Sequence, residues 1–227
     1  MIVLVEKHNA HRYAHLIDEM FRLRARIFRD RLKWDVQVAD GKERDKYDDG
    51  TPVYIIYADD EGREVKGSLR LLPTTGPTLL ADLFSDTVPD AVHLSAPTIW
   101  ECTRFCLSDK ILDERRQDGI CLASTILIVA LGEVAISAGI ESIIANFDSS
   151  MLRIYRRIGC KVEVLGSTSR FGRPIYLGLF PISAPILCGI KERMKTSYAT
   201  FAITPGAADP RFLELGAAFS RESALDY

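Results

Sequence analysis

The stretch ICLASTILIVALGEVAISAGIESIIANF (120–147) joins two kinds of regular structure. Its first part is almost continuously apolar and rich in helix formers, and Gly139 stands where a helix would end. The residues after it, 142–147, are mostly apolar with two isoleucines and predict a buried strand. Four polar residues interrupt the apolar part: Ser124, Thr125, Glu133 and Ser137. The pattern therefore predicts a buried helix leading into a strand, and not a membrane span.

Helices and strands are predicted to alternate on both sides of this stretch. Apolar residues recur at helical spacing over 11–31 and again over 149–158, where Gly159 is placed as a C-cap. Runs that predict strands lie at 2–5, 53–58, 65–72, 99–107, 161–165 and 173–180. Residues 181–227 contain four prolines and only a weak helical pattern. No break in composition divides the chain, so a single α/β domain is predicted.

The composition is that of an ordinary globular protein. The chain has 227 residues, of which 47% are hydrophobic and 26% charged, which excludes a disordered or collagen-like protein. A net charge of −2 gives no argument for nucleic-acid or membrane binding. Five cysteines without a CxxC pair, and an N-terminus without the features of a signal peptide, predict reduced thiols and a cytoplasmic location.

A polar loop over 34–50 is a candidate functional segment, because long loops without periodicity are uncommon in compact domains. Trp34 begins it, and Asp45 and Asp48 lie three residues apart within it. Two carboxylates at this spacing either face solvent or bind a cation, such as an arginine or the ammonium group of a ligand.

Two charged residues, Glu101 and Arg104, lie in the otherwise apolar strand 99–107. Buried charges are costly unless they are paired, so these residues predict either a buried ion pair or a functional site. Residues three apart in a regular strand point to opposite faces, so a shared site requires a β-bulge. Arg70 lies on the polar face of its own strand, 65–72.

Two basic clusters have both a functional and a structural interpretation. Arg115 to Gly119 precede the long helix and suit a phosphate group, or form a solvated connector. The second cluster suits an acidic partner, or is a wet helix face; it consists of Arg153, Arg156, Arg157 and Lys161. No spacing of cysteine and histidine suits a metal such as zinc, and neither a GxSxG nor a Walker motif is present.

Several of these segments, taken together, resemble the acyl-homoserine-lactone synthases, the autoinducer synthases of bacterial quorum sensing. The resemblance is carried by FRLRARIFRDRLKW (21–34), Asp45 and Asp48, GSLRLLPT (67–74), Phe84 and WECTRF (100–105), and in looser form it reaches Met151-Leu152. It implies a fold like that of the GNAT acetyltransferases: a twisted mixed β-sheet flanked by helices on both faces, opened between two central strands to admit an acyl-pantetheine. Residues 1–227 would form one domain, with an N-terminal helix and substrate-covering loop (1–50), a sheet core (51–180) and a C-terminal extension (181–227).

The resemblance also implies the reaction. The α-amine of S-adenosylmethionine attacks an acyl thioester, its carboxylate closes the lactone, and 5′-methylthioadenosine leaves. S-adenosylmethionine is then a substrate, and no cofactor is implied. The acyl donor is left open between acyl-carrier protein, which would suit the basic cluster at 153–161, and acyl-CoA, which would suit Arg115 and Arg116.

The resemblance assigns roles to individual residues. Glu101 is the candidate base, and Arg70, Arg104, Asp45 and Asp48 complete the catalytic set. The S-adenosylmethionine side is assigned to Arg24, Phe28, Trp34, Phe84, Arg104 and Phe105. The pantetheine phosphate is assigned to Arg116 and Gly119, and the acyl pocket to Ala145, Phe147, Met151 and Leu152. Because Ala145 offers no hydroxyl to a 3-oxo group, an unsubstituted, branched or aryl acyl chain is expected.

Two other functions remain compatible with the sequence. A GNAT-type acyltransferase would act on another amine without making a lactone, although the 21–48 block is not a general GNAT feature. A non-catalytic module would bind acyl thioesters only, although it would not need the charges of Glu101 and Arg104 in an apolar strand.

Overall fold

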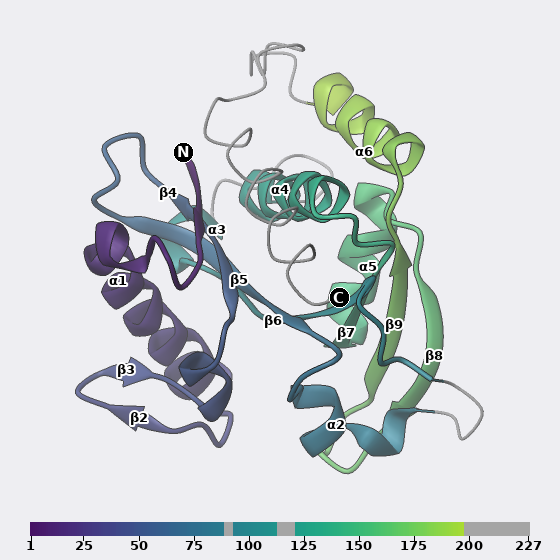
Figure 1. The fold of residues 1–227 in the computed structure, drawn as a ribbon, viewed down its shortest axis with the longest axis horizontal. Helices are drawn as coiled ribbons and strands as arrows, with labels where there is room; N and C mark the ends of the chain where they lie inside the picture. The colour runs from purple at the N-terminus through teal and green to yellow at the C-terminus, as the bar shows by residue number, and fades with distance from the viewer. Residues whose placement is uncertain (89–92, 113–120, 198–227) are drawn as a thin grey trace, which may run out of the picture.

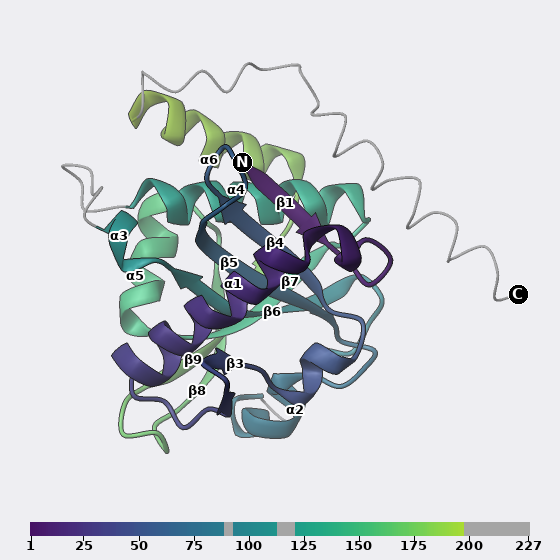
Figure 2. The same ribbon diagram turned by 90° about the vertical axis from the view of Figure 1, so that its left-hand side faces the viewer.

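The computed structural model describes residues 1–88, 93–112 and 121–197. Its centre is a twisted seven-stranded sheet with the strand order β1-β4-β5-β6-β7-β9-β8. Helices cover both faces of the sheet (Figures 1 and 2). The fold is therefore a single α/β domain, as the alternation of sequence patterns predicts.

The strands lie close to their predicted positions. They are β1 (Ile2–Val5), β4 (Val53–Ala58), β5 (Val65–Pro73), β6 (Ile99–Leu107), β7 (Ser142–Asp148), β8 (Glu163–Thr168) and β9 (Ile175–Pro181). Neighbouring strands are antiparallel except β6 and β7, which run parallel. Since a parallel pair needs a long crossover, helix α4 (Leu122–Ser137) lies between these two strands in the chain.

The sheet opens between β6 and β7. Only residues Ile99, Trp100 and Glu101 of β6 pair with β7, where they face Ser142, Ile143 and Ile144. Both strands continue past this point, β6 to Leu107 and β7 to Asp148, and each stays paired only with its outer neighbour. The two halves of the sheet thus separate just beyond Glu101.

Each face of the sheet packs against its own helices. Helix α1 (Ala14–Arg24) continues into a wider π-helical turn, η2 (Ala25–Arg31), and packs against apolar side chains of β1 and β4. The opposite face packs against α4, α5 (Ser149–Ile158) and α6 (Ala184–Ser197). Short helices α2 (Leu79–Leu83), η4 (Ser85–Thr87) and α3 (Asp109–Leu112) lie near the ends of the strands. No helix among the described residues is long and apolar enough to cross a membrane.

Two helix ends follow directly from local sequence. Asp148 caps α5 by accepting hydrogen bonds from the backbone N–H groups of Ser150 and Met151. Gly159 ends the same helix at φ +99°, and Gly139 follows α4 at φ +70°. Both glycines adopt the left-handed conformation that residues with a Cβ avoid.

Two segments are more ordered than their sequences indicate. The polar stretch 34–50 contains a two-stranded hairpin, β2 (Val38–Ala39) and β3 (Lys42–Glu43), and a single helical turn, η3 (Lys46–Asp49). Residues Ala184–Ser197 form helix α6, although the prolines of the C-terminal region weaken the helical pattern. Pro185 is tolerated because it lies in the first turn, where no intrahelical N–H bond is needed.

Candidate active site

Two aspartates and two arginines form a buried network beneath α1. Arg70 binds Asp45 with Nη1 at 2.5 Å and Nη2 at 2.9 Å, and its Nη1 also lies 2.8 Å from Asp48. Arg24 binds Asp48 through both terminal nitrogens at 2.9 Å. Arginine's planar fork suits such two-point contacts with carboxylates. The cations that Asp45 and Asp48 bind in this structure are therefore the protein's own arginines.

The three-residue spacing of Asp45 and Asp48 has a local cause. Asp45 is the N-cap of η3, where its side chain accepts from the backbone N–H of Tyr47 at 3.1 Å. Asp48 accepts in return from the backbone N–H of Asp45 at 2.9 Å. This reciprocal capping box fixes both carboxylates within the loop.

Glu43 is a third acid of the network, which no pattern in the sequence predicts. It is fully buried, with Oε2 2.5 Å from Nε of Arg24 and Oε1 3.0 Å from Nη2 of Arg104. In the sequence it is one acidic residue among several in a polar loop, so no signal distinguishes it. Only the β2–β3 hairpin turns it inward.

A β-bulge brings Arg104 to this network. Ser68 pairs with Cys106 and Arg70 pairs with Thr103, so one residue of β5 faces two residues of β6 between these pairs. Arg104 lies in the bulge at φ +55°, an uncommon conformation for a residue with a side chain. The bulge re-aims Arg104, which binds Asp45 at 2.7 Å as well as Glu43.

The network is balanced in charge. It holds three arginines, Arg24, Arg70 and Arg104, and three acids, Glu43, Asp45 and Asp48. Four members have side chains at most 1% exposed, whereas Arg104 is 9% and Asp45 16% exposed. Asp45 and Arg104 are therefore the members that a bound molecule can reach.

The electrostatics follow from this pairing. Burial alone would raise the pKa of Asp48, but Arg24 and Arg70 hold it well below its usual range. Burial alone would lower the pKa of Arg24, and its bonds to Asp48 and Glu43 raise it instead. The Tyr54 hydroxyl donates to Asp48 at 2.8 Å, and burial together with that carboxylate raises the pKa of Tyr54. All these groups stay in their ordinary charge states at neutral pH.

Glu101 is 1% exposed and lies where β6 and β7 separate. Its two carboxylate oxygens accept hydrogen bonds from the first backbone N–H groups of α2, Leu79 at 2.8 Å and Leu80 at 2.7 Å. Burial raises the pKa of Glu101 to about 7, against the opposing effect of these two bonds and of Arg70 and Arg104. A carboxyl group with this pKa exchanges protons near neutral pH.

Aromatic side chains lie over the open side of the network. Phe28 stacks on Trp34 at 5.1 Å between ring centroids, and the guanidinium group of Arg104 lies 5.5 Å from the Phe28 ring. The guanidinium group of Arg173, from the β8–β9 turn, lies 5.6 Å from the Trp34 ring. In the same region Phe84 contacts Phe171 of that turn at 5.2 Å. These contacts join the N-terminal segment to the far half of the sheet.

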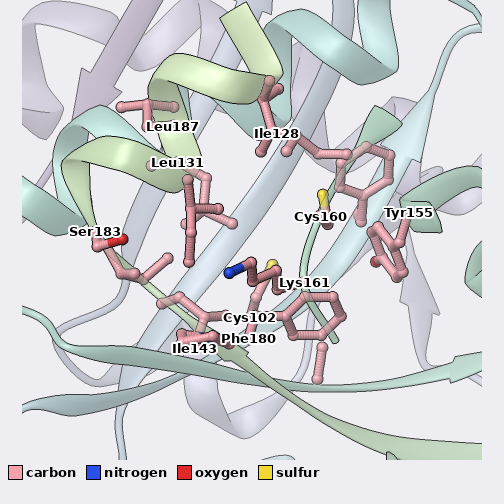
Figure 3. A pocket seen from close by; sticks show the side chains of 17 residues that line it. Cys102, Ile128, Leu131, Ile143, Tyr155, Cys160, Lys161, Phe180, Ser183 and Leu187 are labelled. Carbon is pink, nitrogen blue, oxygen red and sulfur yellow. The ribbon is translucent and has the colours of Figure 1, made fainter. Parts of the chain in front are cut away.

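An apolar cavity of about 70 Å³ lies on the other face of the sheet, toward α4 and α6 (Figure 3). Ala145 and Phe105 line it. Phe147 packs beside it, against the lining residues Tyr155 and Phe180. Met151 and Leu152 are half-buried on α5 and are not among its lining residues. Arg116 and Gly119, assigned to the phosphate, lie outside the described residues.

A sheet that opens between two parallel strands, with an acidic and basic cluster on one face and an apolar cavity on the other, defines an acyltransferase of the GNAT-like class. The autoinducer synthase family matches residues 8–185. An acyl-homoserine-lactone synthase of Rhizobium etli is 41% identical over 168 residues, which covers 74% of this chain and 77% of that protein. Another from Agrobacterium fabrum is 33% identical over 174 residues, covering 77% and 82%. The chain therefore belongs to the autoinducer synthase family and is an enzyme of the acyltransferase type.

The solved structures agree with this assignment. The structure of the CoA-dependent acyl-homoserine lactone synthase BjaI with S-adenosylmethionine and isopentyl-CoA matches with a TM-score of 0.76 and 27% identity, covering 86% of this chain and 89% of BjaI. The resemblance in the sequence and the GNAT-like fold that it implies are thus confirmed.

Proposed function

We propose that this enzyme joins the α-amine of S-adenosylmethionine to the acyl group of a thioester and then closes the product to an N-acyl-L-homoserine lactone. In the second step the carboxylate attacks the γ-carbon, and 5′-methylthioadenosine leaves from the sulfonium centre. The observation that carries the proposal is the charged network at the opening of the sheet, in a chain of the autoinducer synthase family. S-adenosylmethionine is a substrate in this scheme, and the scheme requires no cofactor.

Asp45 and Arg104 are the residues proposed to contact S-adenosylmethionine. Their side chains are the most exposed of the network, and they present opposite charges 2.7 Å apart. An amino acid carries both charges as well, so its ammonium group suits Asp45 and its carboxylate suits Arg104. Arg24, Arg70, Glu43 and Asp48 then act as positioning residues that hold the two contact groups in place.

Phe28, Trp34 and Phe84 are proposed to cover the rest of this substrate, whereas Phe105, assigned to the same side from the sequence, lines the apolar cavity on the other face of the sheet. The stacked pair of Phe28 and Trp34 offers flat apolar surface beside Arg104, which suits the adenine ring. Trp34 is 39% exposed and Phe84 is half-buried, so both offer surface to a ligand.

Glu101 is proposed as the base that removes a proton from the attacking amine, directly or through a water molecule. An ammonium group has no lone pair, so it cannot attack a thioester until it loses that proton. A pKa of about 7 supports this role. Backbone N–H groups beside the bulge at Arg104 are proposed to donate to the oxyanion of the tetrahedral intermediate.

The acyl donor is proposed to be an acyl thioester of CoA or of acyl-carrier protein. Both carriers are anionic, and α5 exposes Arg153 and Arg156 on the side of the sheet that holds the cavity. The bound isopentyl-CoA in BjaI supports CoA, whereas an acidic carrier protein suits the same basic helix face. Assays with one acyl group on each carrier separate these donors through kcat/KM.

Mass spectrometry of an organic extract from cells that express the chain tests the proposed function. We expect a parent ion that yields the fragment common to all homoserine lactones, and its mass identifies the acyl group. The matched control is the Asp45→Asn variant, which should give no signal. Extracts and purified protein that produce no lactone from any offered donor would contradict the proposal.

A further inference from the structure

The apolar cavity begins where the sheet opens. Glu101 and Ile144 are the last paired residues of β6 and β7, and the next residue of each strand, Cys102 and Ala145, lines the cavity. From there the lining continues through Ile143 and Phe180 of the sheet and Ile128 and Leu131 of α4. A chain that enters through the opening therefore finds apolar walls directly behind the reacting carbonyl.

Helix α6 supplies the opposite wall. Ile186, Leu187 and Ile190 of this helix all line the cavity. In the view of Figure 3, Leu187 lies on the other side of the lining from Cys102, with Leu131 between them. Leu187 is only 8% exposed, so it is a fixed part of the wall.

The Leu187 side chain packs directly against Gly132. Gly132 lies in the interior of α4, where glycine is the least favourable residue after proline. A Cβ atom at this position would lie 2.9 Å from Cδ1 of Leu187, closer than real contacts permit. The Leu187 side chain thus occupies the space that a side chain at 132 would fill. The position of the wall depends on this pair of residues.

We propose that Gly132 and Leu187 set the length of the acyl chain that the enzyme accepts. This inference rests on the proposed acyl transfer and adds the specificity of its donor. The cavity of about 70 Å³ has roughly half the volume of the ~150 Å³ cavity that holds benzene in a protein interior. The substrate class is therefore a short acyl chain of about four or five carbons, counting the carbonyl carbon that stays at the opening.

Lys161 is the one charged residue in the lining within the part of the chain that the structure describes, and Figure 3 shows its amino group directed toward the middle of the cavity. Lys161 is exposed, so its ammonium group stays hydrated and does not need to enter the apolar space. The other polar groups in the lining are the hydroxyls of Tyr155 and Ser183 and the thiols of Cys102 and Cys160, and the remaining side chains are apolar. A chain with a saturated hydrocarbon end suits these surroundings.

Two substitutions move the wall in opposite directions. Leu187→Ala removes three carbon atoms from it and makes room for a longer chain. Gly132→Ala adds a methyl group under Leu187 and drives the flexible end of that side chain into the cavity. The experiment measures kcat/KM for butanoyl and hexanoyl thioesters on the same carrier, in the wild-type protein and both variants. Ile136→Ala is the control, because Ile136 lies on the same helix, is exposed and does not line the cavity.

We expect Leu187→Ala to raise the hexanoyl-to-butanoyl ratio of kcat/KM about fifteenfold, since hexanoyl has two more methylenes and each buried methylene changes a binding equilibrium about fourfold. Gly132→Ala should lower the ratio at least threefold, and Ile136→Ala should leave it unchanged. The ratio is formed within one variant, so a smaller fraction of folded protein cancels from it. Ratios that stay within twofold of wild type in both variants, or that move in the same direction, would overturn the inference. Release of methylthioadenosine by the wild-type protein tests the proposed reaction separately.

Discussion

Arg104 contacts Glu43 with two nitrogen atoms of its guanidinium group, Nε at 3.1 Å and Nη2 at 3.0 Å from Oε1. The two residues are 61 positions apart, and both lie in unusual local structure: Arg104 in a β-bulge and Glu43 at the end of a two-residue strand. Their contact joins the N-terminal loop to the central sheet. It also holds Arg104, which is proposed to bind substrate, in one orientation.

Glu43→Ala should destabilise the protein strongly. The substitution leaves two buried arginines, Arg24 and Arg104, with one carboxylate fewer, and breaking a buried ion pair costs about 3–5 kcal/mol. Urea unfolding followed by circular dichroism measures the change. Glu64→Ala serves as the control, because it removes a surface ion pair with Lys110 and should leave the midpoint nearly unchanged. Equal midpoints for the two variants would contradict the structural role of Glu43.

Arg104→Lys should fold but lose about 100-fold in kcat/KM. Lysine keeps the charge, yet a single ammonium group cannot bind Glu43 at two points, reach Asp45 and cover the Phe28 ring together. A displacement of the substrate-binding group by about 1 Å is sufficient for a loss of this size. Steady-state kinetics together with a thermal melt check this prediction. A Lys variant with wild-type turnover would show that the guanidinium geometry is unimportant.

The rate should depend on pH through Glu101. Its pKa is raised to about 7, so below that pH the carboxyl group is protonated and cannot act as a base. We expect kcat/KM of the wild-type enzyme to rise with pH through about 7. Glu101→Gln should lose at least 100-fold and should lack this rise, keeping only the titration of the substrate amine near 8.

Glu101 also accepts the two N–H groups that begin α2, so lower activity in the Gln variant alone does not establish a base. The shape of the pH profile makes the distinction. A purely structural role predicts a lower rate with an unchanged profile, and that outcome would remove Glu101 as the base.

Much of the fold follows from sequence patterns because local forces fix it. The alternation of residues predicts the strands, and Gly159 predicts the end of α5, since its φ of +99° is one that other residues avoid. The spacing of Asp45 and Asp48 likewise has a local cause, because the two residues form the capping box of one helical turn.

The remaining features depend on contacts that no local pattern records. The bulge at Arg104 arises from the register of β6 against β5, so the sequence alone leaves Arg104 and Glu101 on opposite faces. Glu43 is buried by a hairpin whose strands have only two residues each. Helix α6 gains its stability by packing on α4 at Gly132, which outweighs its weak intrinsic pattern.

Arg173→Ala should raise the KM for S-adenosylmethionine about threefold and leave kcat nearly unchanged. The Arg173 guanidinium group lies over the Trp34 ring, and an exposed contact of this kind is worth about 0.5–1 kcal/mol. Without this contact, the Trp34 ring is held less firmly over the bound S-adenosylmethionine. Initial rates at varied S-adenosylmethionine concentration check the prediction. Arg63→Ala, which removes an exposed arginine paired with Glu61, is the control, and an equal effect in both variants would contradict the prediction.

The most direct test of the proposed reaction is the stoichiometry of its two products. Purified protein is incubated with S-adenosylmethionine and a butanoyl thioester, and liquid chromatography with mass spectrometry quantifies methylthioadenosine and acyl-homoserine lactone. We expect equal amounts of both products, dependent on the donor and abolished by Asp45→Asn. An acylated amine without methylthioadenosine would show an acyltransferase that makes no lactone, and bound thioester without turnover would show a binding module; either result would contradict the account.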